Sequence, residues 1–365
     1  LGYENETIDI SGFNGEIKKA KMLYFAKASL TSSILLTKVG RAKDAIVRRI
    51  RKTEYTKNTE VRNAAFKRFE KQYFRMSPIY KSKKELGENC TRYDAVLVGS
   101  DQLWLPGNIA ADYYTLNFAP NSVNTIAYAT SFGQSTLPND AIKRAQVFLN
   151  KIKHIGVREE SGAKLVKDIT GRNVPVVCDP TLLFDGDDWM TIQDAKPLIE
   201  GDYIFVYFLG SNEMHRHFVS RLSKETGLKV VCLPHIDEYV KADEECSDIK
   251  LYDVDPGQFL NLIRNAKYIC TDSFHCSVFS IQYKKEFFTF RRFASSNKQS
   301  TNSRLDTLFN ITGINGRLLV GDEDISKVMQ TKTDYSSVHE RLGKIREESY
   351  RYLVTALEDQ RSTDL

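Results

Sequence analysis

The sequence predicts an α/β fold with two Rossmann-like, doubly wound domains that face a cleft. Short apolar segments of strand length alternate with longer segments whose apolar residues recur at helical spacing. This alternation pauses at the polar stretch Asp185–Asp188 and then starts again, and 365 residues are enough for two ordinary domains. Because strands that alternate with helices pair in parallel, each series of segments predicts one parallel sheet.

The first domain is expected over residues 1–190. It opens with a short strand at 5–10, followed by a basic helical insertion over about 15–77, which contains no proline. Strands are then expected at 95–98, 125–129, 155–158 and 174–178, with helices at about 140–151 and 159–166.

The second domain is expected over residues 191–335. Its predicted strands are 203–208, 228–233, 268–270 and 286–290, and its predicted helices are 213–226, 256–265, 274–281 and 304–312. A last helix at about 336–359, within the segment 336–365, is expected to cross back to the first domain.

Charge is distributed unevenly along the chain. The net charge is +5, but twenty basic and six acidic residues lie between Glu16 and Glu85, so the remainder is net acidic. The block Arg48–Lys52 is the densest part of this basic stretch. A solvated helical face is one explanation, and peripheral contact with a membrane surface or a lipid-linked glycan is the alternative. Nucleic acid is not expected as a partner, because no binding motif accompanies the charge.

Several protein classes are disfavoured by the sequence. Six scattered cysteines without a CxxC pair indicate reduced, mostly buried thiols, which favours the cytoplasm and not a zinc site. No run of eighteen apolar residues and no signal-peptide pattern occurs. The glycine-rich motifs for dinucleotides and for P-loops are absent, so neither a metal nor a nucleotide cofactor is expected.

His275 is the most informative candidate site residue. The segment Thr271–Ser273, which follows a short apolar strand, offers three good helix N-caps, so His275 falls in the first turn of a helix. Free N–H groups and the positive end of the helix dipole favour a phosphate or carboxylate there. A histidine in that place can both contact an anion and transfer a proton.

Other chemically capable residues also follow predicted strands. Asp101, Arg158 and Asp179 each stand at the end of a strand of the first domain. Ligands of such sheets gather at the carboxyl ends of the strands, so these residues are expected to line the cleft. For Asp179, which precedes a proline, a turn is the more ordinary interpretation.

Five segments together resemble the polysaccharide pyruvyl transferase family over about residues 90–310. They are Val98–Trp104, Ala127–Gly133, Val157–Gly162, Cys178–Phe184 and Asp272–His275. The resemblance implies transfer of the enolpyruvyl unit of phosphoenolpyruvate to a sugar hydroxyl or diol, usually as a ketal. It also implies a GT-B-like architecture of two Rossmann-like domains.

The resemblance implies a donor side. Arg158 and His275 are expected to hold phosphoenolpyruvate, converging from the two domains, with Ser273, Phe274 and Arg304 as further donor-side residues. The planar guanidinium of Arg158 matches a carboxylate or phosphate. A salt bridge to a neighbouring carboxylate is the alternative for each arginine, and a capping or core role is the alternative for His275.

An acceptor side is expected in the first domain. Asp101 is the candidate base for the acceptor hydroxyl, or alternatively a helix cap, and Ser100 lies beside it. Trp104 and Tyr128 are candidates for stacking on a sugar ring, with core packing as the alternative. His275 is the candidate acid for the methylene carbon of the donor, or an imidazolium that stabilises the phosphate.

The chain departs from the family pattern in two places. Many members carry an arginine where this chain has Ser273, so that cation is expected from Arg304 or Arg291. The family also usually opens with a strand, a loop and a helix that are not found after Leu1, and we expect this unit upstream. A polar loop at about 295–303 is expected to act as a lid.

The function expected from the sequence is pyruvyl transfer from phosphoenolpyruvate to a sugar of a surface polysaccharide or its lipid-linked precursor. A GT-B glycosyltransferase that uses a nucleotide sugar is the alternative enzyme. A degenerate, non-catalytic member that binds glycans or membranes through the basic segment is the third alternative.

Overall fold

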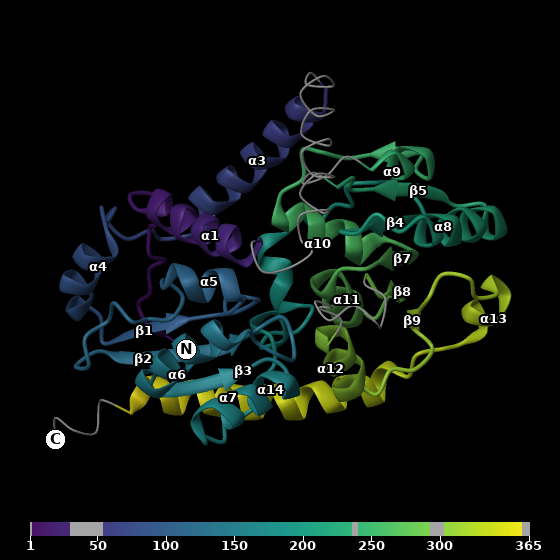
Figure 1. Cartoon of the computed structure of the whole chain (residues 1–365). Helices are drawn as coiled ribbons and strands as arrows, with labels where there is room; N and C mark the ends of the chain where they lie inside the picture. Colours follow the sequence, from purple (N-terminus) through teal and green to yellow (C-terminus); the bar gives the residue numbers. More distant parts are fainter. Residues whose placement is uncertain (1, 30–53, 236–239, 293–302, 360–365) are drawn as a thin grey trace. The chain divides into compact units, whose positions relative to one another are not determined.

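The computed structural model describes residues 2–29, 54–235, 240–292 and 303–359 (Figure 1). The chain forms two compact units. Unit 1 comprises residues 1–45, 74–183 and 344–365, and unit 2 comprises residues 46–73 and 184–343. The predicted basic block Arg48–Lys52 and most of the predicted lid lie outside the described residues.

Unit 1 contains a three-stranded parallel sheet in the order β1-β2-β3. The strands are β1 (Ala95–Val98), β2 (Asn124–Thr130) and β3 (His154–Val157). Every residue of β2 is buried, as expected for a central parallel strand covered on both faces. The strands predicted at 5–10 and 174–178 are single bridges, Thr7–Met76 and Val157–Val176. In the second segment Pro175 has no N–H to donate, which limits the ladder.

The helices of unit 1 connect these strands and extend from them. They are α1 (Asn14–Ser29), α4 (Lys83–Asn89), α5 (Pro106–Ala111), α6 (Asn139–Lys151) and α7 (Glu160–Thr170), with short 3₁₀ turns η1 (Cys90–Arg92) and η2 (Pro180–Leu182).

The long C-terminal helix α14 (Tyr335–Glu358) belongs to unit 1 from Lys344 onward. Tyr352 donates a hydrogen bond to the carbonyl of Ala127 on β2 at 3.1 Å. The side-chain amide of Asn124, at the start of β2, donates to the carbonyl of Ala356 at 2.7 Å. The end of the chain is therefore part of the core around β2.

Unit 2 contains a six-stranded parallel sheet in the order β6-β5-β4-β7-β8-β9. Numbered along the unit, this is the order 3-2-1-4-5-6 of a doubly wound Rossmann sheet, so the predicted fold class is confirmed. The direction of winding reverses between β4 and β7, which is the switch point of the sheet. The strands are β4 (Tyr203–Tyr207), β5 (Lys229–Cys232), β6 (Ile249–Lys250), β7 (Tyr268–Thr271), β8 (Glu286–Phe290) and β9 (Leu318–Leu319).

Helices of unit 2 follow the strands in alternation. They are α8 (Glu213–Thr226), α9 (Lys241–Glu245), α10 (Pro256–Asn265), α11 (Phe274–Gln282), α12 (Ser303–Thr312) and α13 (Ile325–Gln330), with a 3₁₀ turn η3 (Asp188–Ile192). Helix α10 begins with a capping box, in which Asp255 and Gln258 exchange side-chain and backbone hydrogen bonds.

Helix α3 (Glu54–Tyr73) belongs to unit 2, although the sequence analysis placed the whole helical insertion in the first domain. Arg62 is buried and donates to the carbonyls of Leu251 and Tyr252 at 2.9 and 2.7 Å. Arg68 also pairs with Asp253 at 2.5 Å. These partners lie nearly two hundred residues away, so the local charge pattern gave no sign of them.

All six cysteines are free, and all except the half-buried Cys246 are buried, as the sequence predicts. Among the described helices, none combines the length and the apolar character that crossing a bilayer requires.

Candidate functional site

The switch point of unit 2 joins the loop after β4 to the turn after β7. The carboxylate of Asp272, whose side chain is fully buried, accepts hydrogen bonds from the backbone N–H groups of Leu209 and Gly210 at 2.7 and 2.9 Å. Burial raises the pKa of Asp272, and Arg292 together with these two N–H groups opposes that shift. Ligands of sheets with this strand order bind at this position.

His275 is where this turn reaches the surface. Ser273 is the N-cap of α11 and accepts from the N–H of Cys276 at 3.4 Å. From Thr271 to Gln282, His275 is the single residue that is not buried. The buried Ser273 and Phe274 therefore support the turn, while His275 presents a titratable group at the start of the helix.

Arg292 is a cation at this site that the sequence analysis missed. It follows β8, and its Nη2 atom lies 3.3 Å from the carbonyl oxygen and 3.7 Å from the carboxylate of Asp272. Its buried Nε atom has no hydrogen-bond partner among the described residues. A Cβ atom at Gly210 would lie 2.9 Å from Cγ of Arg292, so the glycine permits this close approach. No sequence motif surrounds Arg292. The pairing of β8 with β7 brings this residue beside Asp272, which follows β7.

The two arginines expected to replace a cation at Ser273 have different surroundings. The guanidinium of Arg304, on α12, lies 5.8 Å from the ring centroid of Phe274, next to the turn. Arg291 pairs with Asp306 at 2.6 Å, on the same helix as Arg304. Arg304 and Arg292 thus both lie beside the β7–α11 turn.

In unit 1, Arg158 is surrounded by three carboxylates. It follows β3 and donates to Asp101 at 3.1 Å, to Glu159 at 3.2 Å and to Asp179 at 2.7 Å. Its side chain is only 3% exposed. Burial by itself lowers the pKa of Arg158, but the three carboxylates outweigh burial, so the pKa is raised and the guanidinium stays charged.

Asp101 is the accessible member of this cluster, with a side chain that is 50% exposed. Its backbone has φ +72°, and its carbonyl accepts from the N–H of Ser131 at 2.9 Å. Just before it, Gly99 has φ +151°, and a Cβ atom there would lie 2.0 Å from the carbonyl oxygen of Tyr128. The backbone of Gly99–Asp101 thus presents the carboxylate of Asp101 at the carboxyl end of β1. Ser100, within this segment, is half-exposed.

Asp179 has both a structural role and a charged partner. Its Oδ1 atom accepts from the N–H and the hydroxyl of Thr181 at 3.1 and 2.7 Å, which caps η2. Its other oxygen holds Arg158. Asp179 is therefore a turn residue, as its position before a proline suggests. It also helps to hold Arg158 in place.

Trp104 and Tyr128 are core residues, which corrects the expectation that they stack on a sugar. Trp104 is fully buried between Phe132 and Phe148 and donates its indole N–H to the carbonyl of Tyr114 at 2.9 Å. Tyr128 is also buried and stacks on the ring of Tyr352. Neither ring offers a face to a ligand, because core side chains occupy both.

Among the remaining histidines, His235 contacts the loop after β4. It follows β5, and its Nε2 atom lies 2.9 Å from the carbonyl oxygen of Leu209. His215 is buried on α8, and His339 contacts the carbonyl of Ile281 at 3.1 Å. Within the described ranges, no group of three or more histidine, cysteine, aspartate or glutamate side chains could hold a metal ion.

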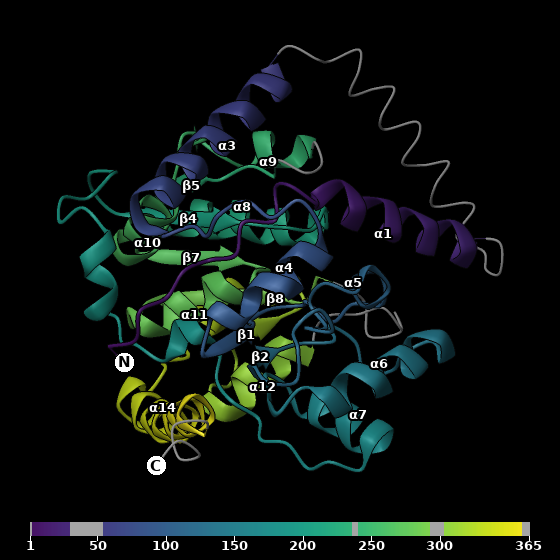
Figure 2. The same ribbon diagram turned by 90° about the vertical axis from the view of Figure 1, so that its left-hand side faces the viewer.

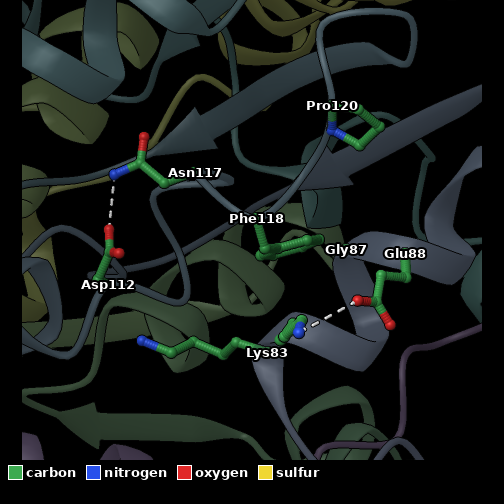
Figure 3. A pocket seen from close by; sticks show the side chains of 8 residues that line it. Lys83, Gly87, Glu88, Asp112, Asn117, Phe118 and Pro120 are labelled. Carbon is green, nitrogen blue, oxygen red and sulfur yellow. Dashed lines mark hydrogen bonds and ion pairs between the residues drawn. The ribbon is translucent and has the colours of Figure 1, made fainter.

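A pocket of about 400 Å³ lies elsewhere in unit 1 (Figure 3). It is lined by α4 and by the segment between α5 and β2, including Lys83, Glu88, Asn117 and Phe118. These segments precede β1 and β2, so the pocket lies toward the amino ends of the strands. Asp101 and Arg158 lie at the carboxyl ends, where catalytic groups of parallel sheets are found.

Rossmann-like units with polar side chains at their strand ends place the protein in a broad class of α/β enzymes and binding proteins. A family model described as polysaccharide pyruvyl transferase matches residues 39–292, more than half of the chain. The chain therefore belongs to the polysaccharide pyruvyl transferase family, and the resemblance seen in the sequence is confirmed.

Solved structures with a similar fold are remote in sequence. A UDP-N-acetylglucosamine 2-epimerase from Rickettsia bellii is 11% identical, with 84% of this chain and 88% of that chain covered and a TM-score of 0.42. A putative UDP-N-acetylglucosamine 2-epimerase from Listeria monocytogenes is 12% identical, with 79% and 83% covered and a TM-score of 0.49. MurG from Acinetobacter baumannii is 12% identical, with 76% and 78% covered and a TM-score of 0.40. No curated protein matches the sequence.

Proposed function

We propose that the protein transfers a pyruvyl group from phosphoenolpyruvate to a sugar of a surface polysaccharide or its lipid-linked precursor, forming a pyruvate ketal. Family membership supports the transferase class. The observation that carries the proposal is the position of His275, the single residue of Thr271–Gln282 that is not buried, in the first turn of α11 at the switch point. The free, mostly buried thiols support a cytoplasmic reaction.

The donor is a small polyanion, so its site needs cations and N–H donors. Arg292 and Arg304 supply guanidinium groups beside the β7–α11 turn, and the first turn of α11 supplies N–H groups. His275 adds an imidazole whose proton can be given to the donor. We assign these groups to the phosphate and carboxylate of phosphoenolpyruvate.

In the proposed reaction, His275 protonates the methylene carbon of phosphoenolpyruvate. The carbon that bears the phosphate becomes oxocarbenium-like, and a sugar hydroxyl attacks it while its proton passes to Asp101. The bond between that carbon and the phosphate oxygen then breaks, and phosphate leaves with the proton that Asp101 took. A second hydroxyl closes the ketal while its proton returns to His275. Phosphoenolpyruvate and a diol thus give a ketal and inorganic phosphate, with one acid and one base cycling their protons.

Arg158 takes a supporting role in this proposal. Its guanidinium is bonded to three carboxylates, and the bond to Asp101 fixes the orientation of the proposed base. Donor binding by Arg158, expected from the family, would compete with these bonds.

The loop after β4 supports a phosphoenolpyruvate donor over a nucleotide sugar. In dinucleotide-binding Rossmann sheets, N–H groups of the first β–α turn bind phosphates. Here the N–H groups of Leu209 and Gly210 donate to the carboxylate of Asp272, so they are already bonded and do not offer a phosphate site of that kind.

Mass spectrometry of cell-surface glycan from strains with and without the gene tests the reaction. We expect one sugar to lose the mass of a pyruvate ketal when the gene is absent. Loss of a whole sugar residue instead would support the nucleotide-sugar glycosyltransferase. An unchanged glycan that still binds the purified protein would support the non-catalytic alternative.

His275→Ala is expected to lower turnover by about 10²–10⁴-fold, because general acid catalysis contributes that much. Asp101→Asn is expected to have an effect of the same order. Phosphate release in the presence of phosphoenolpyruvate and acceptor measures both. His217→Ala, at an exposed histidine on α8, is the matched control. Near-wild-type turnover in either site variant would remove that residue from the mechanism.

Arg292→Gln is expected to weaken phosphoenolpyruvate binding by roughly tenfold or more, since a charge-assisted contact is lost. Isothermal titration calorimetry measures the dissociation constant, and Arg291→Gln is the control at the neighbouring position. Equal affinities of the two variants would contradict the assignment of Arg292. Binding of a nucleoside diphosphate in preference to phosphoenolpyruvate would contradict the donor.

A further inference from the structure

The helix α1 is firmly attached to unit 1 along one side. Ile17 is buried, and Phe13, just before the helix, makes an edge-to-face contact with Tyr113 at 5.4 Å between ring centroids. Glu16, in the first turn, lies 3.6 Å from Nζ of Lys83. In Figures 1 and 2, α1 runs beside α5 in unit 1. The orientation of α1 on this unit is therefore fixed by its contacts.

Away from these contacts, the surface of α1 exposes large apolar side chains. Met22 is 72% exposed, Leu23 is 55% exposed and Phe25 is 54% exposed. Residues three apart on a helix are neighbours, so Met22 and Phe25 adjoin, while Leu23 lies further around the helix. Isolated exposed apolar residues are ordinary, but three large ones within four residues of one helix indicate an interaction surface.

Lysines alternate with these apolar side chains around the exposed side of α1. Lys18 and Lys19 lie one turn before Met22 and Leu23, Lys27 lies one turn after Leu23, and all three are exposed. The positive charge continues in the sequence after α1. Eleven basic residues and one acidic residue lie between Lys18 and Lys52.

We propose that this side of α1 docks onto an anionic lipid surface. Apolar side chains between lysines match a membrane interface, where the apolar groups enter the acyl boundary and the lysines meet anionic headgroups. A second copy of the chain is a poorer occupant, because a symmetric contact would bring Lys18, Lys19 and Lys27 against the same lysines. Docking concerns the place of the reaction and does not depend on its chemistry.

Vesicle flotation tests the proposal with the full chain. We expect binding to vesicles of phosphatidylglycerol in phosphatidylcholine, weaker binding at high salt, and little binding to pure phosphatidylcholine. Met22→Ser/Leu23→Ser/Phe25→Ser and Lys18→Glu/Lys19→Glu are each expected to lower the partition coefficient at least roughly tenfold. Val147→Ser, at an apolar residue of α6 that is 63% exposed, is the control and should bind like wild type.

Phe25 also contacts Gly107 on α5, so Met22→Ser/Leu23→Ser is included in case the triple variant does not fold. Failure of the wild type to bind phosphatidylglycerol vesicles, or equal binding of wild type and α1 variants, overturns the proposal. So does a dimer in analytical ultracentrifugation that the α1 variants abolish, because α1 would then serve self-association. Transfer to a soluble acceptor should be unchanged in folded α1 variants, which separates this test from that of the proposed reaction.

Discussion

At the scale of single residues, Arg158 shows how strongly a buried charge depends on its partners. Glu159 and Asp179 are both 2% exposed, and each bonds to its guanidinium. Arg158→Gln would leave these carboxylates buried without that cation. We expect the free energy of unfolding to fall by about 3 kcal/mol, as for other buried pairs broken on one side.

Urea denaturation measures this loss. Lys164→Gln, which removes an exposed lysine paired with Asp168 at 2.6 Å, is the control and should change the stability by less than about 0.5 kcal/mol. An Arg158→Gln variant as stable as the control would show that the cluster does not need its cation.

His215 makes the stability depend on pH. Burial, followed by the charge of Arg216, lowers the pKa of His215 from 6.5 to about 4. As pH falls below about 6.5, the unfolded chain binds a proton at this residue while the folded protein does not. The free energy of unfolding therefore decreases between about pH 6.5 and pH 4, by up to about 3 kcal/mol from this residue.

Comparison of urea denaturation at pH 7.5 and pH 5 checks this expectation. His215→Phe, which keeps a ring stacked on Phe290, should reduce the difference between the two pH values, whereas the exposed His217→Gln should leave it intact. A His215→Phe variant with the full wild-type difference would assign the pH dependence to other groups.

His275, Asp101 and Arg158 could be proposed as site residues from the sequence, because each follows a recognisable strand. Arg292 could not be found in this way, since its neighbours are set by the pairing of β8 with β7 and not by adjacent residues. The sequence also left two roles open for Trp104, stacking on a sugar ring and packing in the core, since an aromatic residue at a strand end suits both. Burial, which depends on the whole unit, decided that question.

At the scale of helices and strands, periodicity predicted the regular elements of both units because their apolar faces repeat locally. The predicted strand at 174–178 is only a bridge, since Pro175 interrupts the hydrogen-bonding pattern. The assignment of α3 failed for another reason. Its charged surface indicated a solvated helix, while the buried Arg62 uses that charge to hold carbonyl groups of unit 2.

Replacing Arg62 should loosen α3 from unit 2. Arg62→Met leaves two carbonyl groups without their donor, so we expect a loss of about 2 kcal/mol in unfolding free energy. Arg68→Met removes an ion pair whose side chains are 61% and 60% exposed, so its loss should stay below about 0.5 kcal/mol. Limited proteolysis of α3 should be faster in Arg62→Met alone, and equal rates would contradict this role.

At the scale of the whole molecule, α14 supplies part of the core of unit 1 from the far end of the chain. Leu353 packs with Tyr128, and Ser349 accepts from the N–H of Cys178 at 2.9 Å. Truncation after Gly343 removes these groups and exposes buried apolar surface. We expect calorimetry to show loss of the unfolding transition of unit 1, with that of unit 2 retained.

Tyr350→Ser is the control for the truncation, because Tyr350 lies on the same helix but is 48% exposed. It should keep both transitions. A truncated protein that unfolds like wild type would mean that unit 1 does not need α14.

The division of the chain into these segments has a consequence for biosynthesis. Every segment of unit 2 has been translated once Gly343 is added, whereas unit 1 waits for residues 344–365. Proteins are made from the amino terminus, so unit 1, which contains the segment before residue 46, is completed after unit 2. Until α14 has been translated, the surface of β2 that Tyr352 contacts stays open to chaperones.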